Sequence, residues 1–175
     1  LRPGETLTIT RTGSEYLRQF RSLGFTATFD GATGLDDDGD GVGNGYEINH
    51  AMSFLDPGDA GSDNDGNGLT ALLEYGFAFD LHGRAALPKL IAVLNPGDGK
   101  TYPALEFIRL NEATTHSDFT CDVTTDLQTF FFGAGATTLV RSPDNGDGTT
   151  TIVERSNTAF IDAPRQFLNL TISPK

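Results

Sequence analysis

Apolar and polar residues alternate along much of the second half of the chain. Residues 118–125 show the pattern clearly, because Phe119, Cys121 and Val123 fall on one side of an extended chain and polar residues on the other. A period of two is typical of a strand with one buried face. Similar short segments lie at 89–94, 104–110, 137–141, 150–154 and 167–172, separated by turn residues. This pattern predicts an antiparallel β-sandwich.

The first half of the chain has a different pattern. Residues 5–11 alternate and predict a strand, whereas residues 14–24 have the spacing of a short helix. Helical spacing returns in two stretches, 45–55 and 70–79, and the first of them places Ile48, Met52 and Leu55 on one apolar face. The predicted fold is therefore mainly β, an antiparallel β-sandwich with an acidic loop–helix insert. Its predicted parts are an N-terminal strand and helix (1–30), the insert (31–83) and the sandwich module (84–175).

Negative charge is concentrated in the insert. Residues 23–83 contain twelve Asp and Glu and no Lys or Arg, whereas the rest of the chain contains twelve acidic and twelve basic residues. The net charge of −12 therefore arises from this one segment. Nucleic acids and anionic membrane surfaces attract basic faces, so neither is expected as a partner, and cations are. No apolar run of about 18 residues predicts a membrane-spanning segment.

The insert contains a match to the twelve-residue EF-hand calcium loop at residues 36–47, DDDGDGVGNGYE. Calcium takes six to eight oxygen ligands, and a tight loop with carboxylates at alternate positions points them inward. Gly41 stands at position 6, where the loop turns sharply. The predicted ligands are Asp36, Asp38 and Asp40 at positions 1, 3 and 5, the carbonyl of Val42 at 7, Asn44 at 9 directly or through water, and Glu47 at 12.

A second match follows at residues 63–74, DNDGNGLTALLE. Its predicted ligands are Asp63, Asp65 and Asn67 at positions 1, 3 and 5, the carbonyl of Leu69 at 7, and Glu74 at 12. Ala71 at position 9 has no ligand atom, so water is expected there. We therefore predict two Ca²⁺ ions, one per loop; a solvated acidic linker is the alternative. The turn-like residues 30–35 and 57–62 precede the loops, so no helix enters either loop, which favours a permanent structural ion over a switch.

These loops resemble the calcium-binding repeats of bacterial secreted proteins, of the thrombospondin type 3 or dockerin kind. The segment GLTALLEYGFAFD also resembles the helix that precedes a β-rich C-terminal region in large bacterial surface and secreted proteins. TCDVTTDLQTF, DNGDGTTTIVERS and APRQFLNLTI resemble the strands of that region, so the resemblance covers about residues 36–173. It implies an extracellular or cell-surface location. Gly43 and Ala71 depart from the usual loop pattern, and no cohesin-recognition pattern, which a dockerin needs, is identified.

These features predict a calcium-stabilised structural or adhesive module, such as a self-assembling surface or filament subunit or the C-terminal module of a larger secreted protein. The alternative is a carbohydrate-binding accessory module of a secreted enzyme, although the chain has no Trp and four Tyr to form an aromatic platform. We do not predict an enzyme. The three His residues share no catalytic spacing with each other or with Cys121, which is expected in the core.

Three consecutive phenylalanines, Phe130 to Phe132, stand in a predicted strand and cannot all face one core. Either both faces of this strand are covered within the fold, or one face packs against another molecule. Residues 129–140 and the β-capable residues 5–10 are therefore the candidate contacts between copies of this chain. The segment PDNGDG (143–148) lacks a closing Glu and predicts a hairpin turn, with a third calcium loop as the alternative.

Overall fold

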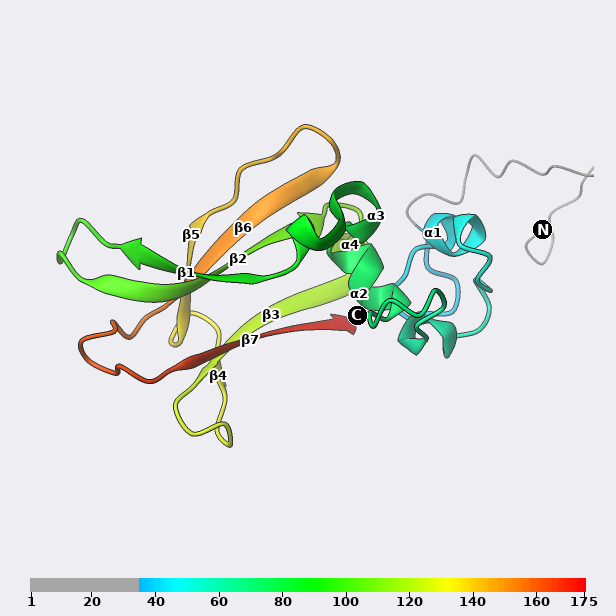
Figure 1. Ribbon diagram of the computed structural model, residues 1–175. Coiled ribbons are helices and arrows are strands. Elements are labelled where there is room, and N and C mark those ends of the chain that lie inside the picture. Colours follow the sequence, from blue (N-terminus) through cyan, green and yellow to red (C-terminus); the bar gives the residue numbers. More distant parts are fainter. Residues whose placement is uncertain (1–34) are drawn as a thin grey trace, which may run out of the picture.

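The computed structural model describes residues 35–175, so the strand, helix and N-terminal part predicted within residues 1–30 lie outside the described residues (Figure 1). The strands are β1 (Lys89–Leu94), β2 (Thr101–Leu110), β3 (Ser117–Thr124), β4 (Phe131–Phe132), β5 (Thr137–Arg141), β6 (Thr149–Ser156) and β7 (Phe167–Pro174). The short helices are α1 (Asn44–Asn49), η2 (Asp59–Gly61), α2 (Ala71–Gly76), α3 (Phe79–His82), η3 (Gly83–Ala86) and α4 (Ala113–His116). The predicted mainly β fold is confirmed.

The strands form two antiparallel sheets. One sheet has the order β1-β2-β6-β5 and the other has the order β4-β3-β7. Phe107 of β2 pairs with Ile152 of β6, and Cys121 of β3 pairs with Leu170 of β7, so the alternating apolar residues of each sheet reach a common core. Cys121 is part of that core, and burial raises the pKa of its thiol to about 12, which keeps it unreactive.

The connection between β5 and β6 is the predicted hairpin turn. The carboxylate of Asp144 accepts the backbone N–H of Gly146 at 2.8 Å, and that of Asp147 accepts the hydroxyl of Thr149 at 2.6 Å. These local hydrogen bonds are typical of Asx turns. His82 of α3 lies 3.0 Å from the other oxygen of Asp147, so this turn is also tied to the helical end of the molecule. Thr149 is fully buried, so its hydroxyl is poorly placed to act as a nucleophile. This favours a structural role for the cluster of His82, Asp147 and Thr149.

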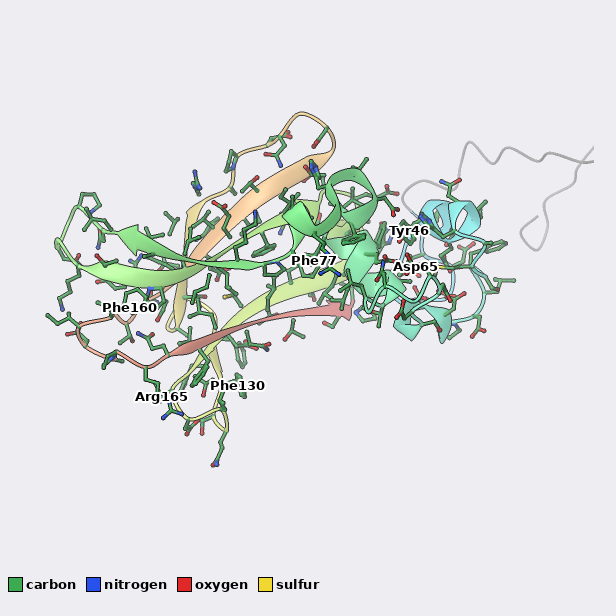
Figure 2. The ribbon with its side chains drawn as sticks, in the orientation of Figure 1. Tyr46, Asp65, Phe77, Phe130, Phe160 and Arg165 are labelled. Carbon is green, nitrogen blue, oxygen red and sulfur yellow. The ribbon has the colours of Figure 1, made fainter. Side chains whose placement is uncertain are left out.

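The acidic insert packs onto one end of the sandwich. Figure 1 shows α2, α3 and α4 gathered at that end, with α1 and the two loops beyond them, and the end of β7 beside them. Phe77, which follows α2, enters the core between the sheets (Figure 2). Its ring meets those of Phe107 and Phe119 edge-on, at centroid distances of 6.1 and 6.2 Å. The insert and the sandwich therefore share one core, across the predicted boundary at residue 83.

The first helix of the insert is shorter than predicted. Helical spacing predicted residues 45–55, but α1 ends at Asn49 and Ala51 adopts a left-handed φ of 56°. The N–H of Met52 then bonds back to the carbonyl of Glu47 at 2.8 Å, which is the bond of a Schellman helix end. The prediction of one apolar helix face formed by Ile48, Met52 and Leu55 is wrong, because α1 ends before Met52, and Ile48 and Leu55 are exposed.

The shared core predicts a large effect of truncating Phe77. We expect Phe77→Ala to lower the free energy of unfolding by about 3–5 kcal/mol, because it opens a cavity between the two sheets. Leu81→Ala is the control, since Leu81 lies in the next helix but is 58% exposed. Urea denaturation of both variants measures the difference. Equal losses in the two variants would show that the insert does not contribute to the core.

Candidate metal centre

The backbone of the first loop is wound around the carboxylate of Asp36. One oxygen of this carboxylate accepts the N–H of Gly39 at 2.8 Å, and the other accepts the N–H of Gly41 at 3.0 Å. Both glycines have a positive φ, of 75° and 91°, which residues with a Cβ rarely adopt. The sequence spacing therefore produces a closed loop whose later side chains turn inward.

The second loop repeats the first at an offset of 27 residues. Asp63 accepts the N–H groups of Gly66 and Gly68 at 2.9 and 3.0 Å, and these glycines have φ values of 75° and 92°. The helix after this loop also ends at a left-handed alanine, Ala78, as α1 ends at Ala51. The insert thus consists of two loop–helix units with the same local backbone, and the three-residue η2 lies ahead of the second loop.

Carboxylates of the first loop converge. Oxygens of Asp36, Asp38 and Asp40 lie within 4.8 Å of one another, and so do oxygens of Asp40, Glu47 and Asp59. Glu47 is fully buried, at the start of the helix that follows the loop, and Asp40 is 4% exposed. Val42, whose carbonyl is the predicted seventh-position ligand, is also fully buried. The structure therefore brings together the predicted carboxylates of this loop and adds one, Asp59.

Most of these buried oxygens have no hydrogen-bond donor among residues 35–175. The oxygens without a donor are the two carboxylate oxygens of Asp38, the two of Glu47, one of Asp40 and one of Asp59. Burial, followed by the neighbouring charge of Asp40, raises the pKa of Asp38 to about 6. Burial, followed by the charge of Asp38, raises the pKa of Glu47 to about 8. Leaving such groups ionised and unpaired is unfavourable, so the arrangement favours either protonation or a positive partner.

The donor set matches a hard divalent cation. Both groups of converging side chains consist of carboxylates alone, and hard cations such as Ca²⁺ prefer oxygen ligands, whereas zinc and copper favour His and Cys. The unpaired oxygens belong to a loop with the spacing of a calcium site, and they face one another across a few ångströms. The residues of the first loop therefore fit Ca²⁺.

Asn44, the predicted ligand at position 9, makes other bonds. Its side-chain oxygen accepts the N–H of Asp37 at 2.9 Å, and its amide nitrogen donates to the carboxylate of Asp37 at 2.9 Å. Asn44 is 4% exposed and lies at the start of α1. In this structure it clamps the start of the loop to the helix.

The second loop is more open. Asp63 and Asp65 are exposed, and the carboxylate of Glu74 accepts a hydrogen bond from the side-chain amide nitrogen of Asn67 at 2.6 Å. The same nitrogen donates to Asp65 at 3.0 Å, and the oxygen of Asn67 accepts the N–H of Leu69. Neither of the two converging carboxylate groups found in the described part of the chain includes a residue of the second loop. The predicted ligands of the second loop thus bond partly to one another.

Asp59 was missed at the sequence level. It lies outside both loops, in the turn-like stretch between them, and a loop motif contains no information about a residue 12 positions beyond its end. The only local signal is its place within the acidic insert. Its position depends on how the two units pack, which the pattern of either loop does not give.

Comparison with known proteins gave no identity. No protein family, no curated protein and no solved structure matches the chain significantly. The resemblance to secreted calcium-binding repeats therefore stays a prediction. In residues 35–175, no helix has the length and apolar character needed to cross a membrane.

The clamp made by Asn44 predicts a stability effect that does not depend on metal. We expect Asn44→Ala to lower the free energy of unfolding by about 1–3 kcal/mol, because two partly buried hydrogen bonds are lost. The loss should be similar with calcium and with a chelator, as measured by denaturant unfolding. Weaker calcium binding with unchanged metal-free stability would instead identify Asn44 as a ligand.

Proposed function

We propose that this protein is a calcium-stabilised structural or adhesive module of the cell surface or the extracellular space. The observation that supports this proposal most strongly is the buried, unpaired carboxylate of Glu47, facing Asp40 in a loop with EF-hand spacing. An ion bound there would replace repulsion among carboxylates by attraction to a common centre. The location follows from the resemblance to secreted calcium-binding repeats.

The attachment of the first loop supports a structural role over a sensing one. The hydroxyl of Ser117, at the start of β3, donates to the carbonyl of Gly41 at 2.7 Å in a buried contact. A Cβ on Gly41 would lie 2.6 Å from that hydroxyl and 3.1 Å from the backbone of Pro174, so the loop sits tightly against both strands. A sensor needs a helix that swings when calcium binds. This loop is fixed to the sandwich, so binding would mainly stabilise the folded state.

Two ions, one per loop, are proposed. They would cancel four of the seven formal negative charges of the loop carboxylates, which are Asp36, Asp38, Asp40, Glu47, Asp63, Asp65 and Glu74. Because a formed site does not exist in the unfolded chain, the free energy of binding adds to the free energy of folding.

Calcium removal tests the proposal. At a free calcium concentration 100 times the dissociation constant, one site stabilises a protein by about 2.7 kcal/mol, which corresponds to a Tm shift of about 5–10 °C for a chain of this size. We expect a chelator to lower Tm by at least this much, as measured by circular dichroism. An unchanged melting curve would contradict the proposal.

Matched variants separate the two loops. Glu47→Gln should remove most of the calcium-dependent Tm shift, because Glu47 is fully buried and has no other partner in the described part of the chain. Glu74→Gln changes the equivalent position of the second loop and should have the smaller effect, because Glu74 already accepts a hydrogen bond from Asn67. A larger effect of Glu74→Gln would reverse this ranking.

The proposed adhesive role has a candidate surface at β4. Phe131 and Phe132 are 60% and 70% exposed, so the alternative in which the fold covers this strand on both faces is wrong for residues 35–175. β4 is an edge strand of its sheet and, within the described part of the chain, pairs with β3 on one side only. Figure 2 places the neighbouring Phe130 well away from Tyr46 and Asp65 in the insert. An exposed apolar edge is available for pairing with a second copy of the chain.

The same surface supports the second candidate function, carbohydrate binding. A groove of about 520 Å³ combines the phenylalanine rings with polar side chains such as Thr124, Thr158 and Gln166. Exposed rings beside hydroxyl and amide groups can contact a sugar by stacking and by hydrogen bonds. A glycan array tests this candidate directly, with reproducible binding that Phe131→Asp abolishes as the supporting result.

Self-association through β4 predicts a change in assembly state. We expect the parent chain to form oligomers at micromolar concentration with calcium present, and Phe131→Asp or Phe132→Asp to shift it to monomer, because a charge would be buried at the contact. Sedimentation velocity measures this. Phe160→Asp is the control, since Phe160 is also exposed but lies on a different loop (Figure 2). A monomeric parent chain would exclude this mode of assembly.

A further inference from the structure

We propose that Asp59 is a direct ligand of the cation in the first loop and completes its coordination in place of Asn44. This inference rests on the proposed function, because it assumes that the first loop binds Ca²⁺. It goes further by assigning a ligand from outside the loop, and with it a mechanical link between the two loop–helix units.

The geometry at Asp59 is that of a fixed ligand. One of its carboxylate oxygens accepts the N–H of Ser53 at 2.8 Å, which holds the side chain in place. Its other oxygen is buried and has no donor among residues 35–175. Asp59 also belongs to the group whose oxygens approach within 4.8 Å, together with Asp40 and Glu47. Asp59 thus presents a carboxylate oxygen close to two other buried carboxylates, of which Glu47 is fully buried and Asp40 is 4% exposed.

The backbone around Asp59 is positioned by apolar packing. Ala60, the next residue, is 5% exposed and belongs to a buried cluster with Val42 and Tyr75. Val42 lies in the first loop and Tyr75 in α2, so this cluster joins both units at η2. The approach of Asp59 to the first loop is therefore set by hydrophobic contacts that do not need an ion. This explains why three like charges can be held together.

The number of ligands agrees with the assignment. Asp36, Asp38 and Asp40 can each supply one oxygen, the Val42 carbonyl one, and Glu47 two. These six, with one oxygen from Asp59, give about seven ligands, within the range that calcium adopts. The side chain of Asn44 is not needed, and its two hydrogen bonds to Asp37 occupy it elsewhere. A fifth carboxylate also adds negative charge to the site, which raises the affinity for a divalent cation.

A ligand from between the loops has a consequence for the fold. Residues 48–58 separate Glu47 from Asp59, so an ion bound to both would close this segment into a ring. Because the ion binds only the folded chain, it would hold the two ends of this segment together there, and opening of the segment would cost a ligand. The proposed ion would thus brace the first loop against the second unit.

Calorimetric titration with calcium tests the assignment on Asp59→Asn and Asp56→Asn in the full chain. Asp56 is the matched control, because it is exposed, lies in the same segment and, among residues 35–175, accepts a hydrogen bond from the N–H of Gly58 at 3.1 Å. We expect Asp59→Asn to weaken the tighter calcium site by about tenfold or more. Asp56→Asn, which removes the same charge, should change it less than about twofold, the effect of an exposed charge.

Melting in a chelator provides the second measurement. An asparagine at position 59 keeps an oxygen for Ser53 and can donate its amide to Asp40 or Glu47. Metal-free Asp59→Asn should therefore melt at a temperature equal to or above that of the parent chain, whereas with calcium it should melt below it. A purely structural role would lower both melting temperatures, and this outcome would overturn the assignment.

The outcomes distinguish this inference from the proposed function. If the parent chain binds calcium and Asp59→Asn binds it equally well, Asp59 is not a ligand and the proposed function stands. Equal weakening by Asp59→Asn and Asp56→Asn would show a general charge effect and would also overturn the assignment. If the parent chain binds no calcium, both the inference and the proposed function are wrong.

Discussion

The mutual repulsion of buried carboxylates in the first loop is the constraint on which the rest of the insert depends. Asp38, Asp40, Glu47 and Asp59 present oxygens that lack a donor in the described part of the chain. Like charges at such short range, away from water, oppose folding strongly unless they are protonated or share a cation. The raised pKa values of Asp38 and Glu47 express that opposition. Protonation would relieve the repulsion, and a hard divalent cation would do so while bridging several of these oxygens at once.

The repulsion can be held in place because the opposite side of the loop is apolar. Val42 and Ala60 pack with Tyr75 and Ala113 beneath the carboxylates, and Ser117 anchors the loop backbone to β3. Two residues beyond Tyr75, Phe77 enters the main core. The charged centre and the sandwich are therefore connected through a few side chains of α2 and its end. A change at the ion site would be transmitted to the sandwich by packing, without a moving helix.

The sequence predicted what depends on short-range periodicity. A period of two located the strands, and the spacing of Asp36, Asp38 and Asp40 predicted the convergence of their carboxylates. The wrongly predicted helix end, the missed Asp59 and the choice left open at Phe131 depend on single backbone torsions or on long-range packing. Ala51 ends α1 early by adopting a left-handed φ, which a helical pattern does not reveal. Asp59 reaches the first loop only because Ala60 packs between the units, and Phe131 is exposed because β4 lies at a sheet edge.

The two loops show that one motif can have two energetic outcomes. The φ angles of the equivalent glycines agree to within a degree, Gly39 with Gly66 and Gly41 with Gly68. Their surroundings differ, because Asn67 stands where the first loop has Asp40. The side-chain amide of Asn67 donates hydrogen bonds to the carboxylates of Glu74 and Asp65. An ion in the second loop would have to replace these bonds and would bind in contact with solvent, so it would gain less. Burial and the identity of one residue at position 5 therefore separate a loop with buried, unpaired carboxylates from a loop whose more exposed carboxylates are already hydrogen-bonded.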